Sequence, residues 1–286
     1  MAVVTPTRKT DWLFEAFKAL NNQSVKRTGT VRSWKWTIGE TEEPVPKQIV
    51  QHPQVKVVKL RPGTTASLRQ QVIEASAGTH ILDLDPEDTL RPNAIQSLLA
   101  ANLDVAYGDA AILGPNGYER MDEGHGWTHR VETVDGLDVP VVESFDPCPR
   151  SLCDAPYSPS GPKMWRRSAI VELGGYDVDI EAGEEIDLIC RAYRRGLTVG
   201  RVPEHVATLR KLDRPRDLGG SDEYKRRLHR DRKAGVDQYL DDLVVEWCRK
   251  NDLRIGGDEL VNADPEGRQA GKYGMIWLDG VIHKLP

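Results

Sequence analysis

Acidic residues are concentrated in one short stretch of the chain, HILDLDPED at residues 80–88. Like charges this close repel one another, which costs stability unless a cation or a polar ligand offsets the repulsion. Carboxylate oxygens are the ligands that magnesium and manganese prefer, and these ions usually keep coordination positions for phosphate oxygens. Asp85, Glu87 and Asp88 are therefore candidate ligands for a divalent metal, Mn or Mg, that holds a diphosphate. The alternative is a solvated turn in which Asp88 only complements the positive end of the following helix.

Strands and helices alternate in the first part of the chain, around the acidic stretch. Apolar and β-branched runs predict strands, and apolar residues at helical spacing predict helices. The candidate strands are residues 2–4, 33–38, 55–60 and 105–107, and the candidate helices are residues 11–20, 65–77 and 94–101. Such alternation predicts an α/β fold with parallel strands and helices on both faces, in which ligands lie beyond the carboxyl ends of the strands. The acidic stretch occupies one such end.

The second half of the chain is less regular. Residues 118–163 are rich in Pro, Gly, Asp and His, and we expect a long irregular region there. Helices over 168–173 and 184–195 and a strand over 197–202 follow. We expect a basic amphipathic helix from about residue 221 and a hairpin at Asp279-Gly280. The chain therefore divides into a domain of residues 1–215 and a C-terminal helical and β-hairpin appendage of residues 216–286.

Composition narrows the class of protein. The chain has 286 residues, of which 29% are charged, and a formal net charge of −5. This charge argues against general attraction to nucleic acid, and four scattered cysteines form neither a disulfide framework nor a zinc pattern. The sequence contains no apolar run of membrane-spanning length and no signal-peptide pattern. We expect a soluble, cytoplasmic protein with no membrane span.

Two segments resemble a known enzyme family. The run RQQVIEASAGTHILDLDPEDTLRP, residues 69–92, resembles without a gap the core signature of inverting family-two glycosyltransferases of GT-A fold, ARNxGIxxAxGxxIxxLDADDxLxP. In this register Arg69 falls on the motif arginine and Asp85 on its first aspartate. Asp83-Leu84-Asp85 is itself a D-x-D motif and remains a rival frame. Residues 166–196, with GGYD and then EEIDL, resemble the family's GGFD and EDxDL motifs, and DVAYGD at 104–109 resembles its DVVYGD.

The resemblance covers roughly residues 1–215 and implies roles for single residues. It implies a mixed GT-A sheet, a nucleotide-sugar donor, usually a UDP-sugar, and a divalent ion. It also implies a carboxylate base that deprotonates the acceptor hydroxyl: Glu185, with Asp187 as the second choice. In the alternative, the acids of this helix only complement its N-terminus and pair with Arg191 or Arg194. The implied donor contacts are Pro6, Thr7, Arg8, Glu40, Arg69, Asp83 and Asp85, and the implied acceptor contacts are Trp165 and Glu184.

Some positions depart from the family pattern. Gly39-Glu40-Thr41 stands where the family has two aspartates, which makes Glu40 the candidate for base recognition. Leu212 stands where a family histidine can bind the ion, with Asp213 or His205 as substitutes. Trp165 can equally belong to the core.

The resulting hypothesis is a metal-dependent, inverting glycosyltransferase. The sequence leaves the acceptor open among a glycan, a protein, a small molecule and a hydroxylated DNA base, the last because of the basic run at 225–233. One rival is a nucleotidyltransferase, although TPTRKTD after the first strand lacks the glycines of a triphosphate-binding loop. The other rival is a non-catalytic carbohydrate-binding protein with a degenerate site.

Overall fold

The computed structural model describes residues 1–24, 34–121, 128–145, 161–180 and 183–211, together with four short strands between residues 254 and 284. The predicted basic helix from residue 221 lies outside the described residues. The division into domains at residue 215 therefore stays a prediction.

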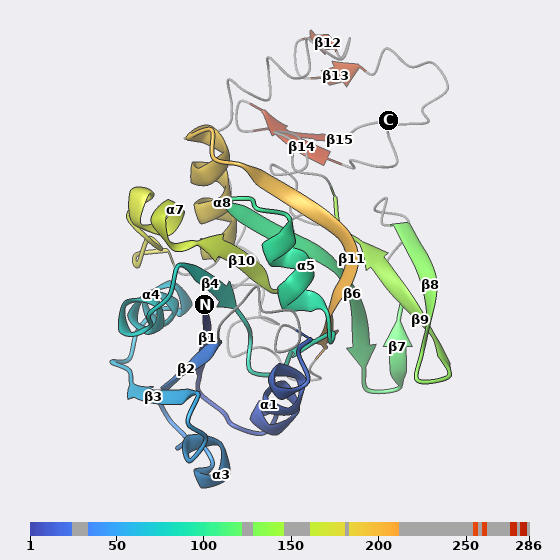
Figure 1. The fold of residues 1–286 in the computed structure, drawn as a ribbon. Helices are drawn as coiled ribbons and strands as arrows, with labels where there is room; N and C mark the ends of the chain where they lie inside the picture. Colours follow the sequence, from blue (N-terminus) through green and yellow to red (C-terminus); the bar gives the residue numbers. More distant parts are fainter. Residues whose placement is uncertain are drawn as a thin grey trace.

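One large mixed sheet organises the described chain (Figure 1). Its main path consists, in spatial order, of β3 (Val55–Lys59), β2 (Lys35–Glu40), β1 (Ala2–Thr7), β4 (His80–Asp83), β10 (Lys163–Arg166), β6 (Val105–Gly114), β11 (Val199–Arg210) and β5 (Thr89–Leu90). The first four strands of this path are parallel to one another. β10 is antiparallel to both of its neighbours, whereas β6 and β11 are parallel. The predicted α/β class with a mixed sheet is confirmed.

Helices cover both faces of the sheet and enclose two apolar cores. Side chains of α1 (Leu13–Asn21) and α5 (Ala94–Ala100) contribute to one core. Side chains of α4 (Thr65–Ala75), α7 (Arg167–Glu172) and α8 (Glu184–Arg194) contribute to the other, and the short α3 (Lys47–Val50) precedes β3. In β1, Val4 joins one core and Val3 the other. Because β1 is buried on both faces, its sequence is apolar rather than alternating.

Local sequence signals determine where α4 and α8, the two helices that contribute most to the site, begin. The hydroxyl of Thr64 accepts the backbone N–H of Ser67 at 3.1 Å and so caps the start of α4. α8 follows Gly183, whose φ of 81° is a left-handed conformation that favours glycine. The first turn of α8 carries three acids, which complement the positive end of the helix.

The predicted irregular region over 118–163 is wrong for much of its length. β7 (Gly117–Glu119) pairs with β6, and β8 (Thr128–Val134) and β9 (Leu137–Glu143) form a hairpin at the right of Figure 1. Asp135 and Gly136, at the turn, both have positive φ angles, as a tight mirror-image turn requires. This Asp-Gly pair was a sequence signal for the hairpin. The charged residues of THRVETV hide its strand pattern.

The corresponding Asp-Gly signal near the C-terminus is confirmed. β14 (Met275–Leu278) and β15 (Val281–Lys284) pair in antiparallel fashion across residues 279–280. β12 (Arg254–Gly256) and β13 (Glu259–Val261) form a second two-stranded sheet.

Three predicted strands, which the structure shows as β1, β6 and β11, are confirmed but extend further than expected. β1 continues through Thr7, so Pro6 and Thr7 belong to the strand. β6 extends to Gly114 and β11 to Arg210.

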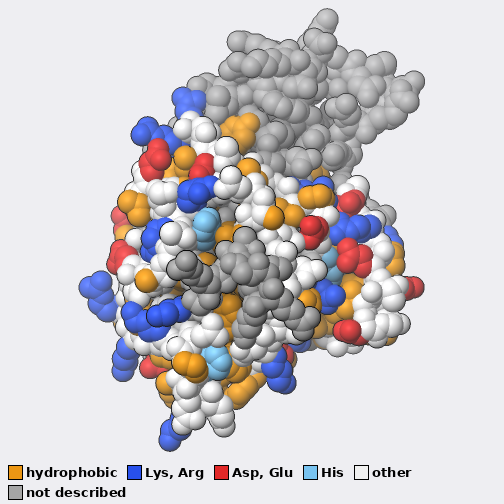
Figure 2. Space-filling view, viewed as in Figure 1, with side chains coloured by type: hydrophobic (Ala, Val, Ile, Leu, Met, Phe, Trp, Pro, Cys, Tyr) orange, Lys and Arg blue, Asp and Glu red, His pale blue; other side chains and the backbone are white. Residues whose placement is uncertain are grey.

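Two features of the described residues concern possible binding partners: the distribution of surface charge and the length of the helices. In the view of Figure 2, Lys and Arg side chains are interspersed with Asp and Glu side chains over the described face. Among the helices that the structure describes, none has the length and apolar character needed to cross a bilayer.

Leu188→Ala tests the anchoring of α8, because Leu188 is fully buried in the core that α8 shares with α4. We expect this change to lower the free energy of unfolding by about 2–5 kcal/mol. Val171→Ala on α7 is the control, since Val171 is 71% exposed, and its effect should stay within about 0.5 kcal/mol. Chemical denaturation measures both, and equal effects of the two changes would contradict this account of the core.

Candidate active site

The candidate site is built around the guanidinium group of Arg69, a buried residue of α4. It contacts four carboxylates. Its Nη2 lies 2.8 Å from Asp85 Oδ1 and 3.0 Å from Glu185 Oε1, and its Nε lies 3.3 Å from Glu184 Oε1. Its Nη1 donates to Asp83 Oδ1. One buried cation therefore joins the end of β4 to the start of α8.

The fold explains why these groups meet. Asp83 is the last residue of β4, and Asp85 follows it at the carboxyl edge of the parallel strands. α4 and α8 belong to the same apolar core, which brings the first turn of α8 to that edge. The polar head of Arg69 reaches the edge while its neighbours Leu68 and Val72 face the core.

Two more residues complete the cluster from other elements. The hydroxyl of Tyr176 donates to Asp83 Oδ2 at 2.8 Å. The ammonium group of Lys163, at the start of β10, donates to Glu185 Oε2 at 2.6 Å and to the carbonyl of Gly161 at 3.0 Å. Because β10 is antiparallel, its first residue lies opposite Asp83 at the same edge. Sequence reasoning missed both Lys163 and Tyr176, although Tyr176 stands in the GGYD motif.

The cluster carries more negative than positive charge when all its acids are ionised, since four carboxylates face two cations. Burial raises the pKa of Asp83 and the pKa of Glu184, and the positive charge of Arg69 opposes both shifts. Burial and then Asp83 raise the pKa of Tyr176 well above its usual value, so its hydroxyl stays a donor. Burial lowers the pKa of Arg69, but Asp83 and Asp85 raise it more, and it stays charged. The excess negative charge is what an additional cation would offset.

The predicted donor contacts surround the same edge. The register of β1 with β2 places Thr7 beside Glu40, and the N–H of Thr41 donates to the carbonyl of Thr7 at 3.1 Å. Glu40 and Arg8 are partly exposed, and Glu40 Oε2 accepts the N–H of Val45 at 3.0 Å. Thr7 is only 2% exposed and its hydroxyl donates to the carbonyl of Lys9, so its side chain faces inward. Pro6 is partly exposed.

The predicted three-carboxylate metal site is not assembled. Asp88 is buried, and its Oδ1 accepts the backbone N–H of Arg210 at 3.1 Å, which ties the end of β11 to the acidic stretch. In the described parts of the chain, no group of three or more His, Cys, Asp or Glu side chains is arranged to hold a metal ion. Asp85 keeps a partly exposed carboxylate. This arrangement fits an ion bound through one or two carboxylates and completed by phosphate oxygens and water.

Of the two substitutes for the family histidine, the structure describes His205, and its ring nitrogens contact groups other than Asp85. Nδ1 of His205 lies 3.2 Å from Glu132 Oε2, and its Nε2 lies 3.0 Å from the carbonyl of Ala207. Asp213 lies outside the described residues.

Two predicted site residues have structural partners instead. Asp187 accepts two hydrogen bonds from Arg191, at 2.7 and 2.9 Å, and Arg191 also donates to the carbonyls of Leu173 and Gly175. This pair braces α8 against the preceding loop, as the alternative interpretation of these acids anticipated. Trp165 is 1% exposed and belongs to the core beneath α8, as the alternative interpretation of this residue anticipated.

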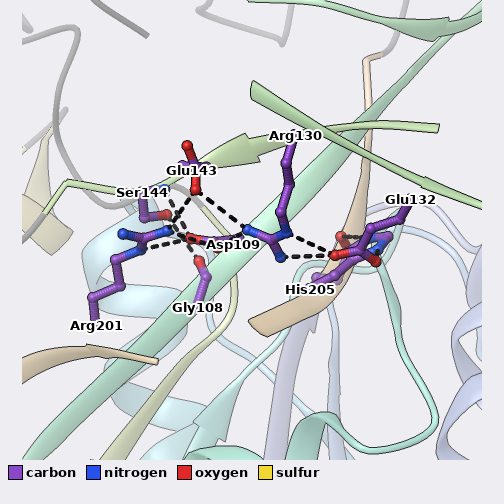
Figure 3. A network of polar contacts seen from close by, with 9 residues as sticks. Gly108, Asp109, Arg130, Glu132, Glu143, Ser144, Arg201 and His205 are labelled. Carbon is purple, nitrogen blue, oxygen red and sulfur yellow. Dashed lines mark hydrogen bonds and ion pairs between the residues drawn. The ribbon is translucent and has the colours of Figure 1, made fainter. Parts of the chain in front are cut away.

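A second polar network holds the β8–β9 hairpin against the sheet (Figure 3). At its centre, Asp109 of β6 is fully buried. Arg201 of β11 donates to both carboxylate oxygens of Asp109 at 2.8 Å, and Arg130 of β8 also donates to this carboxylate. The N–H of Ser144 adds a hydrogen bond at 2.9 Å. Since the Asp109 carboxylate is enclosed by these donors, we assign the network to structure.

Comparison with known proteins shows the type of fold. No protein-family model matches the chain, and no curated protein does. The 1–349 fragment of S. aureus TarS in complex with UDP matches at 14% identity and a TM-score of 0.55, over 87% of this chain and 71% of that one. The same fragment in complex with UDP-GlcNAc gives a TM-score of 0.56 at 14% identity, over 87% and 72%. A further TarS structure gives 0.52 at 14% identity, over 86% of this chain and 43% of that one.

The chain has a GT-A glycosyltransferase fold. The fold expected from the two sequence motifs is thereby confirmed. At this identity the likeness shows the GT-A architecture alone.

Arg69→Met tests the role of the central cation, because it leaves the surrounding carboxylates without their main counter-charge. We expect a loss of about 3–5 kcal/mol in the free energy of unfolding at neutral pH. Without Arg69, the pKa values of Asp83 and Glu184 in the folded protein rise further. A carboxylate whose pKa is raised in the folded state destabilises the fold when it is ionised, and this destabilisation disappears as the pH falls below the raised pKa. The loss of unfolding free energy caused by Arg69→Met should therefore become smaller on acidification.

Thermal unfolding between about pH 5 and pH 8 measures this dependence. Arg195→Met is the control, since the Arg195–Glu172 pair is exposed and should contribute under about 1 kcal/mol at any pH. A penalty for Arg69→Met that is constant across pH would contradict the electrostatic explanation.

Proposed function

We propose that this protein is an inverting glycosyltransferase that moves a sugar from a nucleotide-sugar, a UDP-sugar, to an acceptor hydroxyl. The observation that carries the proposal is the Arg69-centred cluster. In this cluster Asp85 and Glu185 contact one cation at the carboxyl edge of a GT-A sheet, which supports a donor side at Asp85 and an acceptor side at Glu185. The TarS structures with UDP and UDP-GlcNAc support a nucleotide-sugar as donor.

The donor is expected along the ends of β1, β2 and β4. Ligands of open α/β sheets bind beyond the carboxyl ends of parallel strands. At this edge Arg8 and Glu40 offer polar groups from the first two strands, and Asp85 offers a carboxylate from the third. We assign Glu40 to the base and Asp85 to the diphosphate side.

A divalent ion, manganese or magnesium, fits Asp85 as its main protein ligand, with Glu87 near it in the sequence. When bound, such an ion neutralises diphosphate charge and stabilises the leaving group. The excess of carboxylates over cations in the cluster supports this proposal, because repulsion among the acids favours another cation.

Glu185 is the proposed general base. Its side chain is 28% exposed, whereas that of Glu184 is 11% exposed and Asp187 is paired with Arg191. Arg69 at 3.0 Å and Lys163 at 2.6 Å fix the orientation of the Glu185 carboxylate, the group that would accept the proton. In the reaction, the acceptor oxygen bonds to the anomeric carbon while the bond from that carbon to the diphosphate oxygen breaks. The hydroxyl proton goes to Glu185, and the electron pair of the broken bond stays on the diphosphate.

The acceptor stays a prediction with several candidates: a glycan, a protein, a small molecule or a hydroxylated DNA base. The basic run at 225–233, which motivates the last candidate, lies outside the described residues.

A ligand panel tests the donor without knowledge of the acceptor. We expect UDP or a UDP-sugar, with manganese present, to raise the midpoint of thermal unfolding more than other nucleotides, because a ligand that binds only the native state stabilises it. Asp85→Ala combined with Glu87→Ala should remove the metal-dependent part of the shift. A shift that is independent of metal and unaltered in the double variant would contradict the assignment.

Glu185→Gln tests the base once a donor and an acceptor, or donor hydrolysis, give a measurable rate. The amide keeps the shape of the side chain but cannot take the proton, so turnover should fall by about 100-fold or more while donor binding persists. Glu172→Gln is the matched control, because Glu172 pairs with Arg195 on the surface of α7 and should keep wild-type turnover. If Glu185→Gln keeps wild-type turnover, Glu185 is not the base. If the wild-type protein turns over none of the common nucleotide-sugars, the alternative of a non-catalytic binding protein is favoured.

A further inference from the structure

Trp12 and Arg210 form a cation–π pair between distant parts of the chain. The Cζ of Arg210 lies 3.9 Å from the centroid of the Trp12 ring. Trp12 directly precedes α1, and Arg210 is the last residue of β11. An indole ring is the best aromatic partner for a guanidinium group, and stacking fixes the orientation of the guanidinium plane.

Two donor atoms of this pair lack acceptors among the residues that the structure describes. Nε of Arg210 and Nε1 of Trp12 are both buried, and neither has a hydrogen-bond partner within the described ranges of the chain. Arg69, Arg191 and Arg201, by contrast, each contact a carboxylate. A buried donor without an acceptor is unfavourable, and this pair presents two of them side by side.

The position of the pair indicates which ligand would supply the acceptors. The backbone N–H of Arg210 donates to Asp88 Oδ1, and the N–H of Asp88 donates to the carbonyl of Asp85, both at 3.1 Å. A chain of two hydrogen bonds, through Asp88, therefore links Arg210 to Asp85, the residue proposed to lie on the diphosphate side. On its other side, Trp12 follows the chain that leaves β1, the first strand of the proposed donor edge.

We propose that Trp12 and Arg210 form an anion subsite that binds phosphate oxygens of the nucleoside diphosphate. This inference rests on the proposed function. It assigns Arg210, a cation of the protein itself, to neutralise part of the negative charge of the diphosphate leaving group. The planar guanidinium group, held on the indole ring, offers charge-assisted hydrogen bonds to phosphate. As the sugar departs, the electron pair left on the diphosphate is partly neutralised by Arg210, and no proton moves to or from it.

The test compares UDP, UMP and uridine as titrants of the full-length protein by calorimetry, with and without manganese. Arg210→Met keeps the apolar stem against Trp12 and removes the charge. We expect it to weaken UDP binding about 10- to 100-fold, since that is the range for hydrogen bonds to a charged group, and to change uridine binding less than about twofold. UMP should fall between them. Arg195→Met, which removes an exposed charge on the far end of α8, should bind all three ligands as the wild type does.

Two further variants guard against a trivial loss of folding. Arg210→Lys keeps the charge but not the planar fork, and Trp12→Phe keeps an apolar ring with weaker cation–π attraction. Both should weaken UDP binding several-fold and leave uridine binding unchanged.

The outcomes separate the two proposals. A wild-type protein that binds UDP while Arg210→Met or Arg210→Lys binds it equally well would overturn the subsite and leave the proposed function standing. Equal losses for UDP and uridine would also overturn it, because they would show a distorted pocket rather than a lost phosphate contact. A wild-type protein that binds no nucleotide would overturn both.

Discussion

The candidate site depends on one buried cation. Asp83 and Asp85 reach Arg69 from the end of β4, and Glu184 and Glu185 reach it from the start of α8, about a hundred positions later in the sequence. Without a positive charge between them, these carboxylates would repel one another at an edge where water only partly screens them. Arg69 therefore holds the start of α8 at this edge of the sheet. Lys163 of β10 and Tyr176 of the loop before α8 add hydrogen bonds to Glu185 and Asp83 in the same cluster.

Exposure separates the acids that can do chemistry from those that hold the fold. Asp109, Asp187 and Asp88 are at most 7% exposed and accept hydrogen bonds from Arg201, Arg191 and the backbone of Arg210. The side chains of Asp85 and Glu185 are 30% and 28% exposed, although both contact Arg69. Of these five acids, Asp85 and Glu185 combine a fixed orientation with access for a ligand, which is what general base catalysis and ion binding require.

The sequence predicted the parallel half of the sheet because strands and helices alternate there with clear apolar periods. It also predicted which acids come near the site, since Asp85 and Glu185 follow from motif register. It did not predict the partners of those acids. Asp88 accepts a hydrogen bond from the backbone of Arg210, 122 positions away. Such a contact depends on how the strands are arranged in the folded sheet, which the local sequence pattern does not show. The hairpin over 128–143 was missed, although Asp135-Gly136 was a usable signal. The sequence left Trp165 open between an acceptor contact and the core, because its burial depends on β4 and β6, which lie on either side of β10 in the sheet.

The central claim is that this edge of the sheet, with Asp85 and the Arg69 cluster, receives a metal-bound diphosphate. A crystal grown with UDP and manganese tests it directly, because anomalous scattering locates the ion independently of the protein chain. The account predicts an anomalous peak within coordination distance of the Asp85 carboxylate, with diphosphate oxygens on its other side. A diphosphate bound elsewhere, far from residues 85–88, would contradict it.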